Sequence, residues 1–252
     1  MQKKIKRDPD IRTRLENIRT MKKSSEPTVI FRHADFLLVD KPAGWAVQGT
    51  DQDLVNYYAK RQKREVHVVN RLDQPVSGLT LLARSPKAAA RLTNIQASGG
   101  IQKKYVAIVE SVITQDHMDI VFPLAKKGQK AILDEQGKEA ITHADVVWRG
   151  DRYTGLVIEC ETGRFHQIRA HLSAIGHAIK GDLKYGAKRS EKEGGIYLHC
   201  FSFQFQYPDY PGETRVAPPE QKSLFQMLPS SLFSTEGVNL PMDGEDEGNI
   251  PG

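Results

Sequence analysis

The segment VVNRLDQPVSGLTLLAR, residues 68–84, is the most informative stretch of the chain. An apolar strand runs into Arg71 and Asp73, a turn with Pro75 and Gly78 follows, and a second apolar strand begins. An aspartate held on a turn between two strands is fixed in space and partly shielded from water, as a nucleophile or general base must be. The alternative is an Asx turn that only closes the hairpin.

Short β-type runs continue on both sides of this segment and predict most of the fold. They are VIFR (29–32), FLLVDK (36–41), VHVVN (66–70), GLTLLAR (78–84), KKYVAIVES (103–111), ITHADVVWR (141–149), YTGLVIECE (153–161) and IYLHCFSFQFQYP (196–208). Helices are expected at SPKAAARLTNIQAS (85–98), RFHQIRAHLSAIG (164–176) and PPEQKSLFQML (218–228). Strands outnumber helices without regular alternation, which predicts a single α+β domain around a mixed, largely antiparallel β-sheet flanked by helices.

Charge divides the chain into three parts. Residues 1–27 form a basic arm and linker, with nine Lys and Arg against three acids in the first 23 positions. Residues 28–233 form the folded domain, and residues 234–252 carry five acids and no base, which predicts a disordered acidic tail. A basic arm and a net charge of +5 favour a polyanionic partner such as nucleic acid, although the same pattern also serves solubility alone.

The composition excludes several classes of protein. No apolar run approaches the length of a membrane helix, and the N-terminus lacks the apolar core of a signal peptide, so a cytoplasmic protein is expected. With only Cys160 and Cys200, each within a strand-like run, no disulfide framework is implied.

A second polar block, ETGRFHQIRAHLSAIGHAIKGDLKYGA (161–187), places hydrogen-bonding side chains on a helix whose other positions are apolar. His166 and Arg169 share one face, as do Gln167 and His171, while Arg164 lies five positions before Arg169. The inward stripe is expected to contain Phe165, Ile168, Leu172 and Ile175. This arrangement suits a site that positions a polar ligand or holds a buried carboxylate, and the alternative is a solvated helix face.

The histidines at 166, 171, 177 and 199 do not predict a metal site. They come without Cys pairs, without an HExxH motif and without closely spaced acidic ligands.

Two shorter blocks are ambiguous on their own. In IQKKYVAIVES (101–111), Tyr105 follows two lysines, a combination that stacks unpaired bases, although a core tyrosine fits equally. In FLLVDKPAGWAVQGT (36–50), Lys41 opens a Lys–Pro–x–Gly turn that could be no more than a turn.

Taken together and in order, these blocks resemble the RluA family of RNA pseudouridine synthases. The resemblance covers roughly residues 28–210 and rests on KPAGW, NRLDQPVSGLTLLA, KKYVAIV, GKEAITHADVV, GRFHQIRAHLSAIGHAIKGDLKYG and LHCFSFQF. It implies the pseudouridine synthase fold, isomerisation of uridine in structured RNA (a stem-loop of tRNA or rRNA), a monomer, and neither a metal nor an organic cofactor.

The resemblance also implies roles for individual residues. Asp73 matches the catalytic aspartate, and Arg71 matches the arginine that enters the RNA and supports the displaced base. Tyr105 matches the tyrosine that stacks on the target uracil, and Arg169 matches the arginine that pairs with the catalytic aspartate. Within the same motifs, Lys41, Arg164, His166 and Gln167 are expected to contribute to substrate or RNA binding.

Three positions depart from the family pattern: Asn70 replaces the histidine of the His-Arg-Leu-Asp motif, Gln48 replaces a common histidine, and Ala178 replaces a common proline. The 27 residues before Thr28 are too few for the small RNA-binding domain that many ribosomal members carry ahead of the catalytic body. Two other functions are considered, a non-catalytic RNA-binding protein with this fold and a glycoside hydrolase or nucleosidase. The latter needs a second positioned acid, for which Asp182 is the obvious candidate.

Overall fold

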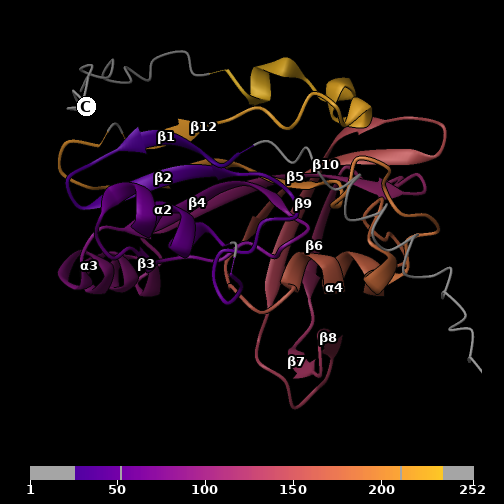
Figure 1. Cartoon of the computed structure of the whole chain (residues 1–252). Coiled ribbons are helices and arrows are strands. Elements are labelled where there is room, and N and C mark those ends of the chain that lie inside the picture. Colours follow the sequence, from indigo (N-terminus) through magenta and orange to yellow (C-terminus); the bar gives the residue numbers. More distant parts are fainter. Residues whose placement is uncertain (1–25, 52, 211, 235–252) are drawn as a thin grey trace, which may run out of the picture.

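The computed structural model describes residues 26–51, 53–210 and 212–234 (Figure 1). Nearly all of the basic arm and of the acidic tail expected from the sequence therefore lies outside the described residues. Within them, no helix is both long and apolar enough to cross a membrane. Cys160 and Cys200 are both free thiols, in agreement with the absence of a predicted disulfide framework.

The described residues form twelve strands and three α-helices with a few 3-10 turns. The strands are β1 (Thr28–Arg32), β2 (Phe36–Lys41), β3 (His67–Val68), β4 (Ser77–Ala83), β5 (Ile101–Glu110), β6 (His117–Val121), β7 (Leu124–Lys127), β8 (Lys130–Leu133), β9 (Ile141–Arg149), β10 (Tyr153–Cys160), β11 (Leu198–Phe205) and β12 (Glu213–Arg215). The helices are α2 (Leu54–Gln62), α3 (Pro86–Ala97) and α4 (Gln167–Ala174), and the 3-10 turns are η1 (Leu183–Tyr185), η2 (Ser223–Met227) and η3 (Ser230–Leu232).

Ten of the strands form one sheet in the order β1-β2-β4-β11-β5-β10-β9-β6, with β3 paired to β4 and β12 paired to β11. Among the described strands, β4 and β11 form the one parallel pair, and the other pairings are antiparallel. The predicted α+β domain around a mixed, largely antiparallel sheet is confirmed.

The helices and the C-terminal segment cover opposite sides of this sheet. In Figure 1, α2, α3 and α4 lie on one side, and the segment with η2 and η3 lies on the other. The β7–β8 hairpin projects beyond α4, and a small apolar cluster joins the two, made of Leu124, Ala131, Ala140, Ala170 and Tyr185. The helix side of the sheet, near α4, carries the polar side chains that the sequence marked as a candidate site.

The predicted helices differ from the observed ones in three ways. The helix over 164–176 begins only at Gln167, because His166 adopts a left-handed backbone conformation with φ 53°, and Phe165 is 41% exposed rather than inward. The segment 218–228 forms the 3-10 turn η2 instead of an α-helix. Helix α2 was missed, although the side chain of Asp53 caps it by accepting a hydrogen bond from the Asn56 N–H at 2.8 Å.

Gly78 allows β4 and β11 to approach closely at the parallel pair. It lies opposite Cys200, and a Cβ atom at this position would lie 2.2 Å from the Cys200 carbonyl oxygen. Its φ of +110° also disfavours any residue with a side chain. Asp73 lies five residues before this contact, so the close approach of the two strands fixes the end of the loop that carries it.

We expect Gly78→Ala to lower the free energy of unfolding by about 2–4 kcal/mol, because it adds both a clash and an unfavourable φ. Urea denaturation of the purified protein measures this. Gly99→Ala is the matched control: Gly99 also has a positive φ (+75°), but nothing lies within 4 Å of its Cβ position. It should cost only about 1 kcal/mol. Equal losses for the two variants would contradict the importance of the close approach.

Candidate active site

Asp73 lies on the loop between β3 and β4, and backbone contacts on both sides hold that loop. The Leu81 N–H donates to Oδ1 of the buried Asn70 at 2.7 Å, and the Val76 N–H donates to the Asp73 carbonyl oxygen at 3.0 Å. Asn70 is the position at which the family pattern has histidine, and here its side-chain oxygen ties the loop to β4. The carboxylate of Asp73 remains 25% exposed, so a ligand can reach it.

Lys41 fixes the neighbouring turn from inside the protein. Its side chain is fully buried, and its Nζ donates to the carbonyl oxygens of Pro42 at 3.0 Å, Trp45 at 2.9 Å and Gln74 at 3.3 Å. Burial lowers the pKa of Lys41 to about 7, against the opposing effect of the Asp73 charge. Because the ammonium is enclosed by backbone carbonyls, the expectation that Lys41 contacts RNA is corrected: it anchors the backbone next to Asp73.

Arg169 on α4 lies between two carboxylates. Its Nη1 donates to Oδ2 of Asp73 at 2.9 Å, while Nε and Nη2 donate to Oδ2 and Oδ1 of Asp182 at 2.6 Å and 2.8 Å. Burial lowers the pKa of Arg169, but the hydrogen bonds and charges of Asp182 and Asp73 outweigh it and raise the pKa overall. The guanidinium carbon also lies 4.9 Å from the centre of the Tyr185 ring. Arg169 therefore presents one fixed positive group to Asp73.

Asp182, considered from the sequence as a possible second acid, binds Arg169, a contact that the sequence reasoning did not predict. It is 2% exposed and binds Arg169 through both carboxylate oxygens. Its backbone also closes the turn, since the N–H groups of Tyr185 and Ala187 both donate to its carbonyl oxygen at 3.0 Å. Because buried charged residues are almost always paired, the arginine of the nearby helix was the signal that could have predicted this partner of Asp182.

His166 lies beside Asp73 as a neutral ring. Its Nε2 is 3.5 Å from Oδ2 of Asp73, and its Nδ1 is 2.8 Å from the Tyr185 hydroxyl. Burial lowers the pKa of His166 to about 4, although the Asp73 charge opposes the shift. The Tyr185 hydroxyl accepts a hydrogen bond from the Ala131 N–H at 2.7 Å, so its own proton can go to Nδ1. That leaves the Nε2–H of His166 facing Asp73.

Arg164 lies on the turn before α4 and Gln167 is the first residue of the helix, and neither is hydrogen-bonded to the Asp73 carboxylate. Gln167 is buried; its Oε1 accepts from the Thr162 hydroxyl and the Arg164 N–H, and its Nε2 donates to the Ile141 carbonyl and the Thr142 hydroxyl. The expectation that Gln167 contacts RNA is therefore corrected, because the oxygen and the nitrogen of its amide are both hydrogen-bonded within the protein. Arg164 is half-buried, and its Nε donates to the Glu139 carbonyl at 2.8 Å.

Tyr105 and Arg71 differ in exposure. Tyr105 is half-buried on β5, opposite Ile158 of β10 and Cys200 of β11. Its pKa is raised well above the ordinary value, mainly by burial. Arg71 is exposed, two residues before Asp73. The structure thus brings Asp73, Arg169 and His166 together, while the contacts of Tyr105 and Arg71 with the substrate stay predictions.

A groove beside the β7–β8 hairpin carries an exposed aromatic ring and three cations, of which the sequence reasoning had singled out only Arg164. Its lining includes Lys126, Lys138, Arg164 and Phe165. The Nζ of Lys126 lies 5.0 Å from the centre of the exposed Phe165 ring, which stacks on His166 at 3.8 Å between ring centres. The Phe165 ring therefore connects the lining of this groove to His166, the neighbour of Asp73.

The family model for RNA pseudouridylate synthase matches residues 35–174, more than half of the chain. The chain belongs to the RNA pseudouridylate synthase family. An uncharacterized RNA pseudouridine synthase of Zymomonas mobilis is 35% identical over 188 residues, which cover 70% of this chain and 86% of the relative. Ribosomal large subunit pseudouridine synthase D of the same organism is 35% identical over 199 residues, covering 71% of this chain and 61% of the relative. RNA pseudouridine synthase YjbO of Bacillus subtilis is 31% identical, covering 67% of this chain and 59% of the relative.

These relatives confirm the RluA-type resemblance and the reaction class, an isomerase that acts on RNA, at the level of the family. Solved structures agree on the fold. Human RNA Pseudouridylate Synthase Domain Containing 1 superposes with a TM-score of 0.65 at 23% identity, covering 78% of this chain and 84% of the human one. Domain Containing 4 gives a TM-score of 0.60 at 21% identity, with 70% and 83% covered. The pseudouridine synthase fold predicted from the sequence is confirmed.

The depressed pKa of His166 predicts a pH-dependent contribution to stability. A base whose folded pKa is lowered contributes stability that is complete above its unfolded pKa and is lost as the pH falls through the folded pKa. For His166 this window runs from about 6.5 down to about 4. Between these two pH values the free energy of unfolding of wild type should fall by about 2–3 kcal/mol more than that of His166→Gln, which has no ring to protonate. Urea denaturation at several pH values measures the difference.

An NMR titration of the His166 ring provides an independent check. A midpoint near the ordinary histidine pKa, or the same pH dependence of stability in His166→Gln and wild type, would show that the ring is not held neutral by burial.

Proposed function

We propose that this chain converts one or a few specific uridines in a structured segment of rRNA or tRNA to pseudouridine, with Asp73 as the catalytic carboxylate. The observation that carries the proposal is the accessible carboxylate of Asp73, which lies 2.9 Å from the buried guanidinium of Arg169. The names of relatives such as ribosomal large subunit pseudouridine synthase D favour rRNA over tRNA.

The reaction needs an ionised carboxylate and little else. The bond from C1′ to N1 of the uracil breaks, the base turns within the site, and a bond from C1′ to C5 forms. C5 loses its proton and N1 gains one, so the reaction is balanced without water or a redox partner. Attack of Asp73 on C1′, attack on uracil C6 and a glycal route all require the charged form of the same side chain.

Arg169 is suited to pair with that charge. Its guanidinium is always protonated, and its Nη1 donates to Oδ2 of Asp73 at 2.9 Å. Because Asp182 already binds two nitrogens of the guanidinium, Arg169 cannot swing away to meet phosphate groups of the RNA. His166 adds no second positive charge at neutral pH, since its pKa is lowered to about 4.

Binding the target nucleotide requires the base to leave its stack, which costs a few kcal/mol. The exposed Arg71 could occupy the gap, and Tyr105 could stack on the extruded uracil. The hydroxyl of Tyr105 stays protonated because burial raises its pKa. The same environment keeps the ring apolar enough to stack.

The groove beside the β7–β8 hairpin supplies a surface for the flanking RNA strand. Lys126, Lys138 and Arg164 can contact phosphates, while the exposed ring of Phe165 can stack on an unpaired base. The basic residues of the arm at 1–23 could add phosphate contacts.

Asp73→Asn should lower the rate of pseudouridine formation by at least about 10³-fold, because the amide keeps the shape of the side chain without its charge. Pseudouridine is mapped by carbodiimide labelling and primer extension in rRNA and tRNA from cells lacking the gene, rescued with wild type or with the variant. Sites that return only with wild type would name the substrate.

If Asp73→Asn restores the sites as well as wild type does, Asp73 is not the catalyst. If no site changes on loss of the gene, a non-catalytic RNA-binding protein becomes the better explanation. Release of free uracil from RNA would instead indicate a nucleosidase. Asp182 does not favour that reaction, because both of its carboxylate oxygens are bound to Arg169.

Asp182→Asn tests the positioning of Arg169. The variant replaces one of the two acceptors, so the guanidinium loses a hydrogen bond and shifts relative to Asp73. We expect kcat to fall about 10–100-fold with little change in KM for RNA, since misplacement of a catalytic group affects the chemical step. Asp182→Glu should recover part of the activity.

Asp53→Asn is the matched control, because Asp53 is an equally buried acid (2% exposed) whose carboxylate caps α2 and accepts from the Thr50 N–H, away from Arg169. It should cost about 1 kcal/mol of stability while leaving kcat unchanged. A fall in kcat for Asp53→Asn equal to that for Asp182→Asn would show that the loss follows stability rather than the position of Arg169.

A further inference from the structure

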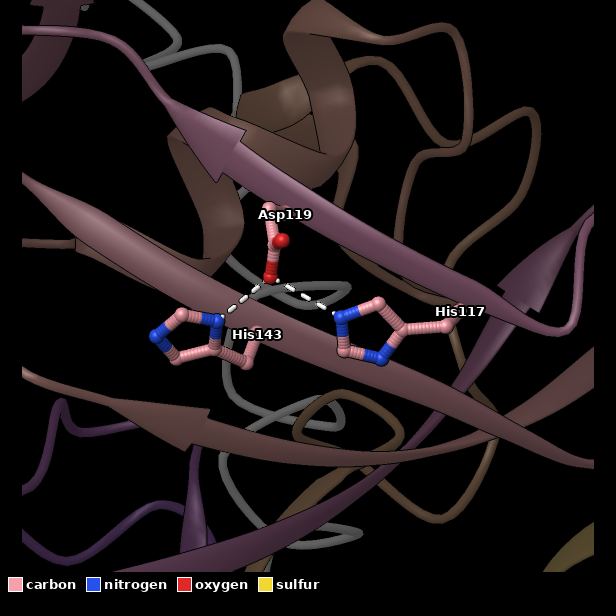
Figure 2. Close-up of side chains that lie close together, drawn as sticks. All are labelled: His117, Asp119 and His143. Carbon is pink, nitrogen blue, oxygen red and sulfur yellow. Dashed lines mark hydrogen bonds and ion pairs between the residues drawn. The ribbon is translucent and has the colours of Figure 1, made fainter.

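Two histidines and an aspartate meet on the surface of the sheet at its β6 edge, away from the candidate active site (Figure 2). His117 and Asp119 are alternate residues of β6, and the antiparallel register places Asp119 opposite His143 of β9. The Nε2 of His117 lies 2.9 Å from Asp119 Oδ1, and the Nδ1 of His143 lies 2.6 Å from the same oxygen. One ligand atom from each residue fits within 4.8 Å of the others.

This cluster faces the opposite side of the sheet from α4. Thr142 points toward α4, because its hydroxyl accepts a hydrogen bond from Gln167 and lies 3.0 Å from Nδ1 of His171. Side chains alternate along a strand, so the next residue, His143, points to the other side. The side chains of His117, Asp119 and His143 are 52%, 57% and 32% exposed, so solvent reaches the cluster.

Each histidine is oriented by a further carboxylate at its outer nitrogen. The Nδ1 of His117 lies 2.6 Å from Asp145 Oδ1, and the Nε2 of His143 lies 2.9 Å from Glu161 Oε1. Both rings therefore turn their second nitrogen toward Asp119. A carboxylate that accepts the outer N–H of a histidine while the inner nitrogen binds an ion is a recurrent arrangement in metal sites.

We propose that His117, Asp119 and His143 form a binding site for a divalent transition-metal ion, for which Zn²⁺ is the best fit. Two imidazoles and one carboxylate suit Zn²⁺, Co²⁺ or Ni²⁺ better than Mg²⁺ or Ca²⁺, which prefer oxygen ligands. The three carboxylates of Asp119, Asp145 and Glu161 outweigh the charge of one such ion. Solvent exposure leaves room for a water molecule as the fourth ligand.

The geometry needs only a small change to accept the ion. Ligand atoms about 2.0–2.1 Å from a tetrahedral Zn²⁺ lie roughly 3.3 Å from one another. The two nitrogen–oxygen distances of 2.9 Å and 2.6 Å must therefore open by less than 1 Å, which partly exposed side chains allow. Without the ion, hydrogen bonds with Asp145 and Asp119 raise the pKa of His117, and those with Asp119 and Glu161 raise that of His143. Protons therefore compete with the metal for both rings.

The histidines of this site are not those at 166, 171, 177 and 199, which have no closely spaced acid in the sequence. The proposed ligands lie on two strands, and Asp119 and His143 are 24 residues apart in the sequence. The antiparallel register of β6 with β9 brings them side by side. Because β6 is an edge strand that leads into the β7–β8 hairpin, a bound ion would clamp the base of this hairpin to the sheet.

The test is calorimetric titration of the full-length protein, first treated with a chelator and then dialysed, with ZnCl₂ near neutral pH. We expect one ion per chain for wild type. Asp145→Asn removes only an orienting carboxylate and should weaken binding about 10–100-fold, whereas Asp119→Asn and His143→Gln remove ligands and should weaken it further. His177→Gln is the control, since this histidine contacts Ser111 and lies outside the cluster.

A second readout distinguishes a specific site from loss of folding. Zinc should raise the melting temperature of wild type and of His177→Gln but not that of Asp119→Asn, and it should slow amide exchange in β6. The absorption spectrum with Co²⁺ should show tetrahedral coordination that Asp119→Asn removes. Circular dichroism establishes that the variants are folded.

Three results would overturn the proposal: no binding of zinc in large excess, equal binding by all variants, or binding that leaves the exchange of β6 amides unchanged. The first would leave the cluster as a network of hydrogen-bonded ion pairs, and the others would place the ions elsewhere. None of these measurements uses RNA, so their outcome is independent of the proposed enzymatic function.

Discussion

The candidate site depends on one buried cation, the guanidinium of Arg169. Burying an unpaired charge is costly, and removing one partner of a buried ion pair typically costs 3–5 kcal/mol. The protein meets this demand with Asp182, which is itself 2% exposed, and with the ring of Tyr185. Since Asp182 holds two nitrogens of the guanidinium, the remaining one reaches Asp73 in a fixed direction. The interaction that stabilises the interior therefore also positions the charge that the proposed chemistry requires.

Loops, rather than regular elements, carry the other half of the site, and buried polar contacts make them rigid. The Lys41 ammonium binds three carbonyl oxygens, one of them that of Gln74, the residue after Asp73. The Gly44 N–H donates to the same Gln74 carbonyl at 2.7 Å, and the Ile196 N–H donates to the Pro75 carbonyl at 3.0 Å. Two segments distant in sequence, one with Lys41 and Gly44 and one with Ile196, thus contact the turn that holds Asp73. Lys41 therefore stabilises this turn although its side chain does not reach solvent.

The sequence predicted the sheet and the residues around Asp73 because both leave local signals. Alternating apolar runs marked most strands, and a serine before Pro86 marked α3, whose N-cap is indeed Ser85. The start of α4 could not be predicted, because the left-handed His166 is held by a contact with Tyr185, 19 residues away, that no local pattern indicates. The roles of Gln167 and Lys41 were also beyond reach, since the sequence shows a polar residue but not whether its partners lie inside the protein.

The two polar systems of this protein use adjacent residues of one strand for different purposes. Thr142 on β9 supports α4 through Gln167 and His171, while His143 faces the other side and joins Asp119. Successive side chains in a strand point to opposite faces, so only the backbone of β9 separates these two groups. That backbone is paired on both sides, with β6 and with β10. An ion at His143 would act on Asp73 only by moving that backbone, which these ladders resist. Metal binding should therefore affect the stability of the edge strand and its hairpin far more than the charge at Asp73, and the two sites can vary independently.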